Sequence, residues 1–321
     1  MSFDTLLPQL ENPEKAPPAK ELTALSGLVG EDRERFLSVW RGLSIQRRRD
    51  IIDLLADIAE DNAEMDFNAV FLVGLLDEDV QVRAESIKAL WEYERNDLVR
   101  ILIRLLGDAE AIVRAEAALG LGRFLLRAEL NDVGTSLMPD IEAALRAVYV
   151  NEAELTEVRG RSLEALGVRA EEWVHDLIEE AYASGDRRLQ ISAVHAMGRS
   201  ADPDWLPALL EEMRSDDAEM RFEAATAAGT MGDDESIPHL VELTRDDDAE
   251  VQEAAITALG QIGGPLGRAA LHAVAEEHND ERVLEAVSDA LSEADFVEDP
   301  LGFKTYLDRS VAEDAGEDGD E

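Results

Sequence analysis

The chain has 321 residues, of which 72 are acidic and 30 basic, and its formal net charge is -42. A surface this negative repels phosphate backbones, so the charge argues against binding to nucleic acid and favours basic partners. The absence of cysteine excludes disulfide bonds and thiol catalysis. The sequence shows neither a signal peptide nor an apolar run of the roughly 20 residues that span a bilayer, and we expect a cytoplasmic protein without membrane association.

The first part of the chain is weakly patterned. Residues 1–18 contain proline and little periodicity, and we expect a loose arm there. Residues 21–29 fit a short helix, while 32–41 and 45–59 fit a divergent helical pair that caps a repeat array. Seven further pairs of amphipathic helices follow, which makes about eight in all. Their expected ranges are 66–93, 96–126, 136–168, 170–199, 203–231, 235–262 and 265–293.

One pattern recurs through these pairs. We count positions within each repeat from one reference residue, called the zero, which is Arg114 in its repeat. The zeros of the other repeats are Arg83, Arg159, Gln190, Arg221, Gln252 and Leu284. The spacings are 31, 45, 31, 31, 31 and 32 residues, which helices placed at random would not produce. A repeat architecture is therefore the first prediction.

Each repeat carries its own helix signals. Apolar or small residues stand one before and three, six and seven after the zero, and these offsets trace one face of a helix. The acidic column four before the zero predicts helix N-caps, and the glycine column eight after it predicts helix ends. The acidic column is Asp79, Glu110, Asp186, Asp217, Asp248 and Asp280. The glycine column is Gly122, Gly167, Gly198, Gly229 and Gly260.

The interval of 45 residues marks one insertion, at about residues 124–140. It contains the turn-like stretch Asn131-Asp-Val-Gly-Thr-Ser. Insertions into repeats map to loops and are sometimes functional, so two interpretations stand. We expect a tolerated extension of a loop, with a functional segment as the alternative.

The pattern Val-Arg-x-x-Ala-x-x-Ala-Leu-Gly at a period near 31 resembles the HEAT repeat, in the short type of the phycobilisome bilin lyases. The resemblance covers about residues 44–293 and implies an all-α fold, an α-solenoid of helix-pair repeats. Because this repeat serves many unrelated proteins, it implies little about function. The expected organisation is an N-terminal arm and short helix, the solenoid, a C-terminal cap or docking segment, and a disordered acidic tail. Their ranges are 1–30, 31–293, 294–311 and 312–321.

No motif in the chain carries recognisable chemistry. The five histidines form no His-Glu-x-x-His motif, and no phosphate-binding loop or nucleophile elbow occurs. The HEAT-type iron enzyme deoxyhypusine hydroxylase uses paired His-Glu dipeptides, and this chain has none. We therefore predict no catalytic residues, no metal ligands and no cofactor, and hence a protein that is not an enzyme.

The arginine column, Arg83, Arg114, Arg159 and Arg221, has two interpretations. It could form a ladder that binds a ligand. We expect instead that each guanidinium reaches acids at helix starts in its own or the adjacent repeat, where partial burial strengthens the pair.

Residues one and five after the zero are expected to point away from the core, on the face that lines the concave side of such repeats. Apolar residues there could anchor a partner protein in an acidic groove. Packing between repeats explains the same residues equally well. The residues of these two columns predicted to bind a partner are Leu119, Ile191, His195 and Phe222. Trp91, which takes the place of the glycine in its repeat, is predicted to bind with them.

The leading functional hypothesis is a non-catalytic scaffold or adaptor whose acidic concave face holds a protein partner with a basic or amphipathic segment. The alternative that the resemblance implies is a bilin lyase-like chromophore chaperone or enzyme subunit. A third, a DNA-repair glycosylase with HEAT-like repeats, needs a basic groove, which only Lys88, Arg123 and a few column arginines could supply. The oligomeric state stays open.

Overall fold

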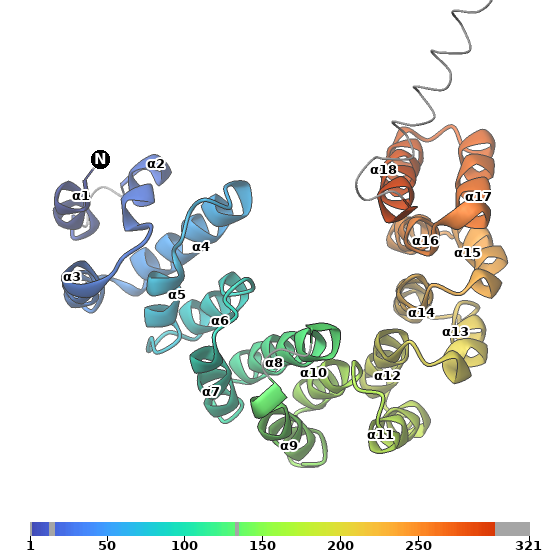
Figure 1. The fold of residues 1–321 in the computed structure, drawn as a ribbon, viewed down its shortest axis with the longest axis horizontal. Helices are drawn as coiled ribbons and strands as arrows, with labels where there is room; N and C mark the ends of the chain where they lie inside the picture. The colour runs from blue at the N-terminus through green and yellow to red at the C-terminus, as the bar shows by residue number, and fades with distance from the viewer. Residues whose placement is uncertain (1, 13–16, 132–134, 299–321) are drawn as a thin grey trace, which may run out of the picture. The chain divides into compact units, whose positions relative to one another are not determined.

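Each sequence repeat folds into one pair of adjacent helices. The computed structural model describes residues 2–12, 17–131 and 135–298, and those residues fold into helices and turns without a strand. They form two units, residues 1–165 (unit 1) and 166–321 (unit 2). Eight helical pairs occur in the described chain, as the sequence predicts (Figure 1).

Unit 1 contains an N-terminal helix, a short second helix and four pairs. These helices are α1 (Phe3–Leu10), α2 (Ala19–Leu22), α3 (Gly30–Trp40), α4 (Ile45–Asp61), α5 (Asn68–Gly74), α6 (Val80–Ala89), α7 (Asn96–Leu105), α8 (Ala111–Asn131), α9 (Met138–Tyr149) and α10 (Thr156–Leu166). Short 3-10 helices at Thr23–Leu25 and Thr135–Leu137 follow α2 and precede α9.

Unit 2 contains the other four pairs. They are α11 (Glu172–Ala183) with α12 (Arg187–Ser200), α13 (Leu206–Glu212) with α14 (Ala218–Met231), α15 (Ile237–Leu243) with α16 (Ala249–Ile262), and α17 (Gly264–Glu277) with α18 (Glu281–Glu298). Two 3-10 helices, Pro203–Trp205 and Asp234–Ser236, precede α13 and α15.

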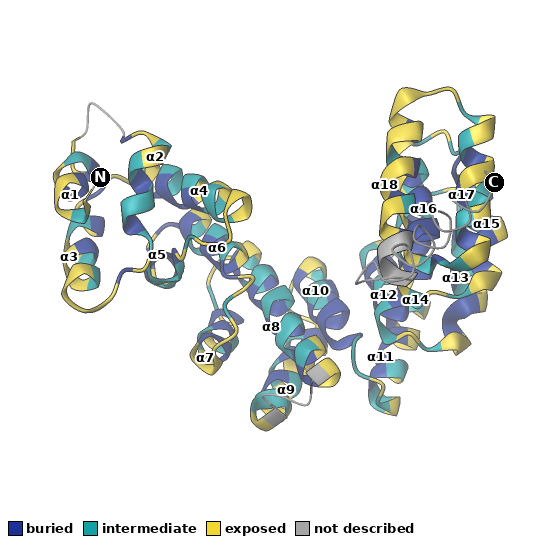
Figure 2. Ribbon diagram, turned by 45° about the horizontal axis from the view of Figure 1, so that its top comes forward, coloured by how far each residue is buried: buried dark blue, intermediate teal, exposed yellow. Residues whose placement is uncertain are grey.

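The second helices of unit 2 form one row and the first helices another (Figure 1). Along the row, α12 packs on α14, α14 on α16, and α16 on α18. The buried residues lie largely between the two rows, and exposed residues lie on their outer sides (Figure 2). The core is therefore a thin layer, as expected for stacked helical pairs.

The acidic column provides helix caps, as predicted. The side chain of Asp79 accepts a hydrogen bond from the backbone N–H of Val82, and Asp248 accepts from Glu250 and Val251. Asp186 and Asp217 cap α12 and α14 in the same way. Each cap satisfies backbone donors that have no partner within the helix and is typically worth about 1 kcal/mol.

The prediction that the glycine column ends helices is wrong for four of its members. Gly122, Gly198, Gly229 and Gly260 lie inside α8, α12, α14 and α16. The left-handed residues that end α12 and α14 come later, at Ala201 and Gly232. Only the fifth, Gly167, directly follows a helix, α10.

The glycine column instead permits close approach of neighbouring second helices. A methyl group at Gly198 would lie 2.5 Å from the Cα atom of Ala227, and one at Gly229 would lie 2.7 Å from the Cα atom of Ala258. In each case the neighbour is the small residue six after the zero of the next repeat. The backbones are therefore in contact, and no side chain fits between them.

The N-terminal residues correct a second prediction. Residues 3–10 form α1 rather than a loose arm, and Leu6, Leu7 and Leu10 are buried. This helix packs on α3 and on the 3-10 helix Thr23–Leu25. Burial of three leucines stabilises the segment by several kcal/mol before its ordering cost is subtracted, which explains why it is not free.

The insertion also differs from the expected loop extension. Helix α8 continues through Gly122 to Asn131 and spans 21 residues, so much of the additional chain is helical. Residues 132–134 lie outside the described part of the chain. So do residues 299–321, which include most of the expected C-terminal cap and all of the expected acidic tail.

The arginine column forms ion pairs between repeats, as predicted for three of its four members. Arg83 binds Asp108, and Arg221 binds Asp246, each through two nitrogen–oxygen contacts of 3.0 Å or less. Their acids lie in the loop that precedes the second helix of the next repeat. Arg114 binds Glu154 likewise, at 2.8 and 2.6 Å. The same three arginines also donate to backbone carbonyls of their own repeat.

Arg159 departs from this arrangement, since its Nε donates to the backbone carbonyl of Tyr149 at 2.7 Å. The side chain of Gln252 donates to the corresponding backbone carbonyl, that of Asp246, whereas Gln190 donates to the backbone carbonyl of Tyr182. The column is therefore a set of structural contacts in the described repeats rather than a row of exposed ligand-binding groups.

We expect acid to weaken these inter-repeat pairs. Hydrogen bonds from Arg114 and Arg221 hold the pKa values of Glu154 and Asp246 below their ordinary range. A carboxylate with a lowered folded pKa stabilises the fold fully above its unfolded pKa, about 4.3 for Glu and 3.9 for Asp, and loses that contribution as the pH falls through the folded pKa.

The free energy of unfolding from urea titrations should therefore fall steeply below about pH 4. Glu154→Gln removes one such carboxylate, so its stability should depend less on pH in this range than that of the wild type. Parallel pH profiles for the two proteins would contradict the assignment of this acid sensitivity to Glu154.

Candidate protein-binding face

No group of three or more His, Asp or Glu side chains in the described residues is placed to hold a metal ion. Within the same residues, no helix has the length and apolar character needed to cross a bilayer.

The five residues predicted to bind a partner are divided between the units. Trp91 follows α6 and is 57% exposed, and Leu119 is half-buried on α8, both in unit 1. Ile191 and His195 lie on α12, and Phe222 lies on α14, in unit 2. Nδ1 of His195 lies 3.2 Å from a carboxylate oxygen of Glu223, so His195 on α12 contacts α14.

The prediction for Ile191 requires correction. It is 1% exposed, so it packs between helices and offers no surface to a partner. Ala84 and Ala115, at the same position of other repeats, are buried as well. Packing between repeats is the correct interpretation for these residues.

Phe222 does line a groove, between α14 and α16. The cavity has a volume of about 320 Å³, and Ala254, Thr257 and Gln261 line it together with Phe222. Two carboxylates, Glu250 and Glu253, also belong to its lining. The half-buried aromatic ring gives this groove an apolar wall, while its rim is acidic.

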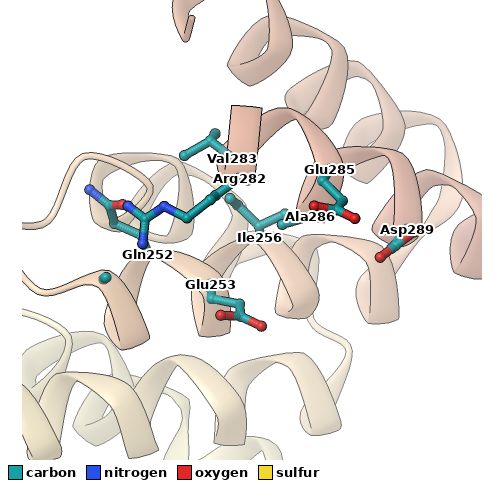
Figure 3. A pocket seen from close by; sticks show the side chains of 9 residues that line it. Gln252, Glu253, Ile256, Arg282, Val283, Glu285, Ala286 and Asp289 are labelled. Carbon is teal, nitrogen blue, oxygen red and sulfur yellow. The ribbon is translucent and has the colours of Figure 1, made fainter. Parts of the chain in front are cut away.

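A second groove lies between α16 and α18, with a volume of about 260 Å³. Ile256, Val283 and Ala286 provide its apolar lining. Arg282 and Gln252 lie at one end in Figure 3, while Glu285 and Asp289 lie toward the other. Glu253 lines this groove as well as the first and so connects the two.

The carboxylates Glu253, Glu285 and Asp289 have no ion pair with a cation among the described residues. The nearest guanidinium of the same groove, Arg282, is instead paired with Asp280 at 3.4 Å. Three unpaired carboxylates around one groove produce a negative potential that a cation would neutralise.

The corresponding helices of unit 1 differ, because their charges are paired with one another. Lys88 on α6 lies 3.1 Å from Glu85 and 3.7 Å from Glu116 on α8. Arg161 on α10 pairs with Glu157 and with the buried Glu164. Each cation offsets part of the negative charge of this face, so a positively charged partner would gain less there than at the unpaired carboxylates of α16 and α18.

The three carboxylates were not among the residues predicted to bind a partner, although their positions in the repeat could have indicated them. Glu253 and Glu285 stand one after the zero of their repeats, and Asp289 stands five after it, in the same columns that include Phe222 and His195. Among so many acids, a charge at these positions was indistinguishable from an ordinary solvated one until the grooves were visible.

Unit 1 contains a larger cavity, of about 470 Å³, beside the insertion. Phe124, Leu137, Met138 and Ile141 contribute apolar walls. Its charged rim is internally paired, since Arg127 binds Glu94 at 2.6 Å and Arg95 lies 3.4 Å from Asp97. The lengthened α8 thus creates a cavity, but one without an unpaired charged group in its lining.

The stacked helical pairs of the two units define an α-solenoid. Residues 174–250 match a family model of HEAT repeats, and residues 237–264 match the model of a single HEAT repeat. Both matches lie in unit 2. The chain is thus an α-solenoid protein with HEAT repeats, and the fold expected from the Val-Arg pattern is confirmed.

Comparison with curated proteins finds no match. Among solved structures, the complex of CpcE and CpcF of phycocyanin lyase from Nostoc sp. PCC7120 is 16% identical, with a TM-score of 0.50 and coverage of 84% of this chain and 96% of that chain. Yeast importin-beta (Kap95p) is 13% identical, with a TM-score of 0.49 and coverage of 91% of this chain and 47% of that chain. The likeness to the lyase complex is one of fold.

Proposed function

We propose that this protein is a non-catalytic scaffold or adaptor, and that the row of second helices in unit 2 binds a partner protein through a cationic or amphipathic segment. The observation that carries the proposal is the pair of adjacent grooves along α14, α16 and α18, whose carboxylates have no cationic partner among the described residues. The apolar lining supplies contact area, and the carboxylates supply selectivity for positive charge.

The charge of the whole chain supports the same partner chemistry. At a net charge of -42, the protein attracts basic proteins at long range and repels nucleic acid. The grooves add a local surface where that attraction becomes a specific contact. The chromophore-chaperone alternative stays a prediction, because the likeness to the phycocyanin lyase complex concerns the fold alone.

Affinity capture from native lysate tests the proposal with a charge-neutralised groove. The variant Glu253→Gln/Glu285→Gln/Asp289→Asn removes the unpaired carboxylates without reducing side-chain volume. We expect the wild type to retain a defined protein at low salt and this variant to lose at least about tenfold of it, since a few charge contacts supply more than the 1.4 kcal/mol that tenfold requires.

The matched control is Asp204→Asn/Glu235→Gln/Glu276→Gln. It removes the same number of charges from the first-helix side of unit 2, where these exposed residues lie in the two 3-10 helices and α17. It should capture the partner as the wild type does. Equal capture by the wild type and the groove variant would reject the second-helix face as the binding site.

A further inference from the structure

The two grooves differ in chemistry in a fixed order along the row. The groove between α14 and α16 has the aromatic ring of Phe222 in its wall. The groove between α16 and α18 has Glu285 and Asp289 in its lining, and Glu253 belongs to both. An occupant that crosses the row therefore meets first a site with an aromatic wall and two carboxylates, Glu250 and Glu253. It then meets a site with three carboxylates and Arg282 in its lining.

The glycine column fixes the distance between these sites. Added methyl groups at Gly229 and Gly260 would lie within 2.8 Å of backbone atoms of Ala258 and Ala290. Helices in such direct backbone contact are at the short end of the usual range of about 8–10 Å between axes. Successive grooves are consequently separated by roughly that same distance.

The size of the grooves indicates the conformation of the occupant. Cavities of about 320 and 260 Å³ admit individual side chains. A helix, with a diameter of about 10–12 Å, would lie outside the grooves and reach them only with its side chains. An extended polyproline II segment advances about 3.1 Å per residue and returns to the same face every three residues, which is about 9.3 Å. That step lies within the usual range of about 8–10 Å between packed helix axes.

We infer that the partner segment is an extended chain that crosses α14, α16 and α18, with an apolar side chain beside Phe222 and an arginine or lysine three residues away beside Glu253, Glu285 and Asp289. This inference rests on the proposed function and specifies the chemistry and spacing of its ligand. Because each side chain enters a separate groove, the spacing between them determines binding as much as the composition does. Arginine should bind better than lysine, since its planar fork can engage more than one carboxylate.

Fluorescence anisotropy with the full chain and short labelled peptides tests the inference. One peptide has a leucine at position i and an arginine at position i+3 in a Pro- and Ser-containing chain. A second has the same composition with the two side chains adjacent. We expect the spaced peptide to bind at least about fivefold more tightly at low salt, and its affinity to fall with added salt.

Two variants distinguish the grooves. Phe222→Ala should reduce binding of the spaced peptide and leave that of a peptide with serine in place of leucine unchanged. Glu285→Gln/Asp289→Asn should reduce the affinity for the arginine-containing peptides, whereas Glu276→Gln on α17 should not. Circular dichroism melting of each variant establishes that the helices remain folded.

The outcomes separate this inference from the proposed function. Equal binding of the spaced and adjacent peptides, with continued dependence on the groove carboxylates, overturns the spacing rule and leaves the proposed function in place. Binding that is insensitive to Glu285 and Asp289 overturns the inference, and lysate capture that is also insensitive overturns the proposed function. Absence of binding by both peptides likewise overturns the inference.

Discussion

Replacement of Gly198 by alanine is expected to lower the free energy of unfolding by about 1–3 kcal/mol, the usual cost of overpacking a close contact. The added methyl group would lie 2.5 Å from the Cα atom and 2.6 Å from the Cβ atom of Ala227 on the neighbouring second helix. Neither atom belongs to a flexible side chain, so the helices themselves must separate. Urea unfolding at neutral pH measures the change.

Gly120→Ala is the matched control, because Gly120 also lies inside a helix. The nearest atom to its added methyl group is Cδ1 of Leu102, at 3.1 Å, which is the end of a flexible side chain. Alanine there should be near neutral or stabilising, since it raises helix propensity by up to about 1 kcal/mol. If Gly198→Ala were as stable as Gly120→Ala, the close contact between α12 and α14 would not constrain the fold.

Replacement of Arg221 by glutamine is expected to lower the free energy of unfolding by about 3 kcal/mol, because it leaves Asp246 largely buried without its partner. The two side chains are 17% and 8% exposed. Glutamine can still donate to the backbone carbonyl of its own repeat, as Gln252 does to Asp246. The loss therefore reports mainly the uncompensated carboxylate.

The chain itself suggests the compensating change. Arg221 pairs with Asp246, which lies 25 residues later in the next repeat. One repeat earlier, the equivalents of these two residues are Gln190 and Ser215. Ser215 Oγ accepts a hydrogen bond from the backbone N–H of Asp217. The carboxylate of Asp246 likewise accepts one from the backbone N–H of Asp248. The double variant Arg221→Gln/Asp246→Ser should thus recover at least about 1 kcal/mol relative to Arg221→Gln alone. A double variant whose loss equals the sum of the two single losses would show that the pair is not coupled.

Much of the candidate site could not be predicted because exposure depends on how closely the helices pack. Ile191 and Phe222 occupy the same position of adjacent repeats, yet Ile191 is buried and Phe222 lines a groove. The sequence gives both the same helical face. Whether a neighbouring helix covers that face is a tertiary property, and it differs between α12 and α14.

The meaning of the glycine column shows the same limit. A glycine eight residues after the zero of a repeat is compatible with a helix end and with a close helix crossing, since both favour a residue without a Cβ atom. The structure places Gly198, Gly229 and Gly260 within helices and against alanines of the next repeat. Only the position of the neighbouring backbone distinguishes the two roles.

The sequence by itself determined the repeat length, the all-α solenoid, the helix-capping aspartates and the pairing of the column arginines with carboxylates. These features follow from periodicity and local hydrogen bonding, which recur every 31 residues. The tertiary structure decided that residues 3–10 pack as a helix, that α8 continues through the insertion, and which carboxylates surround a groove. Those outcomes depend on contacts between segments that are distant in sequence, and no local pattern specifies the packing distance between them.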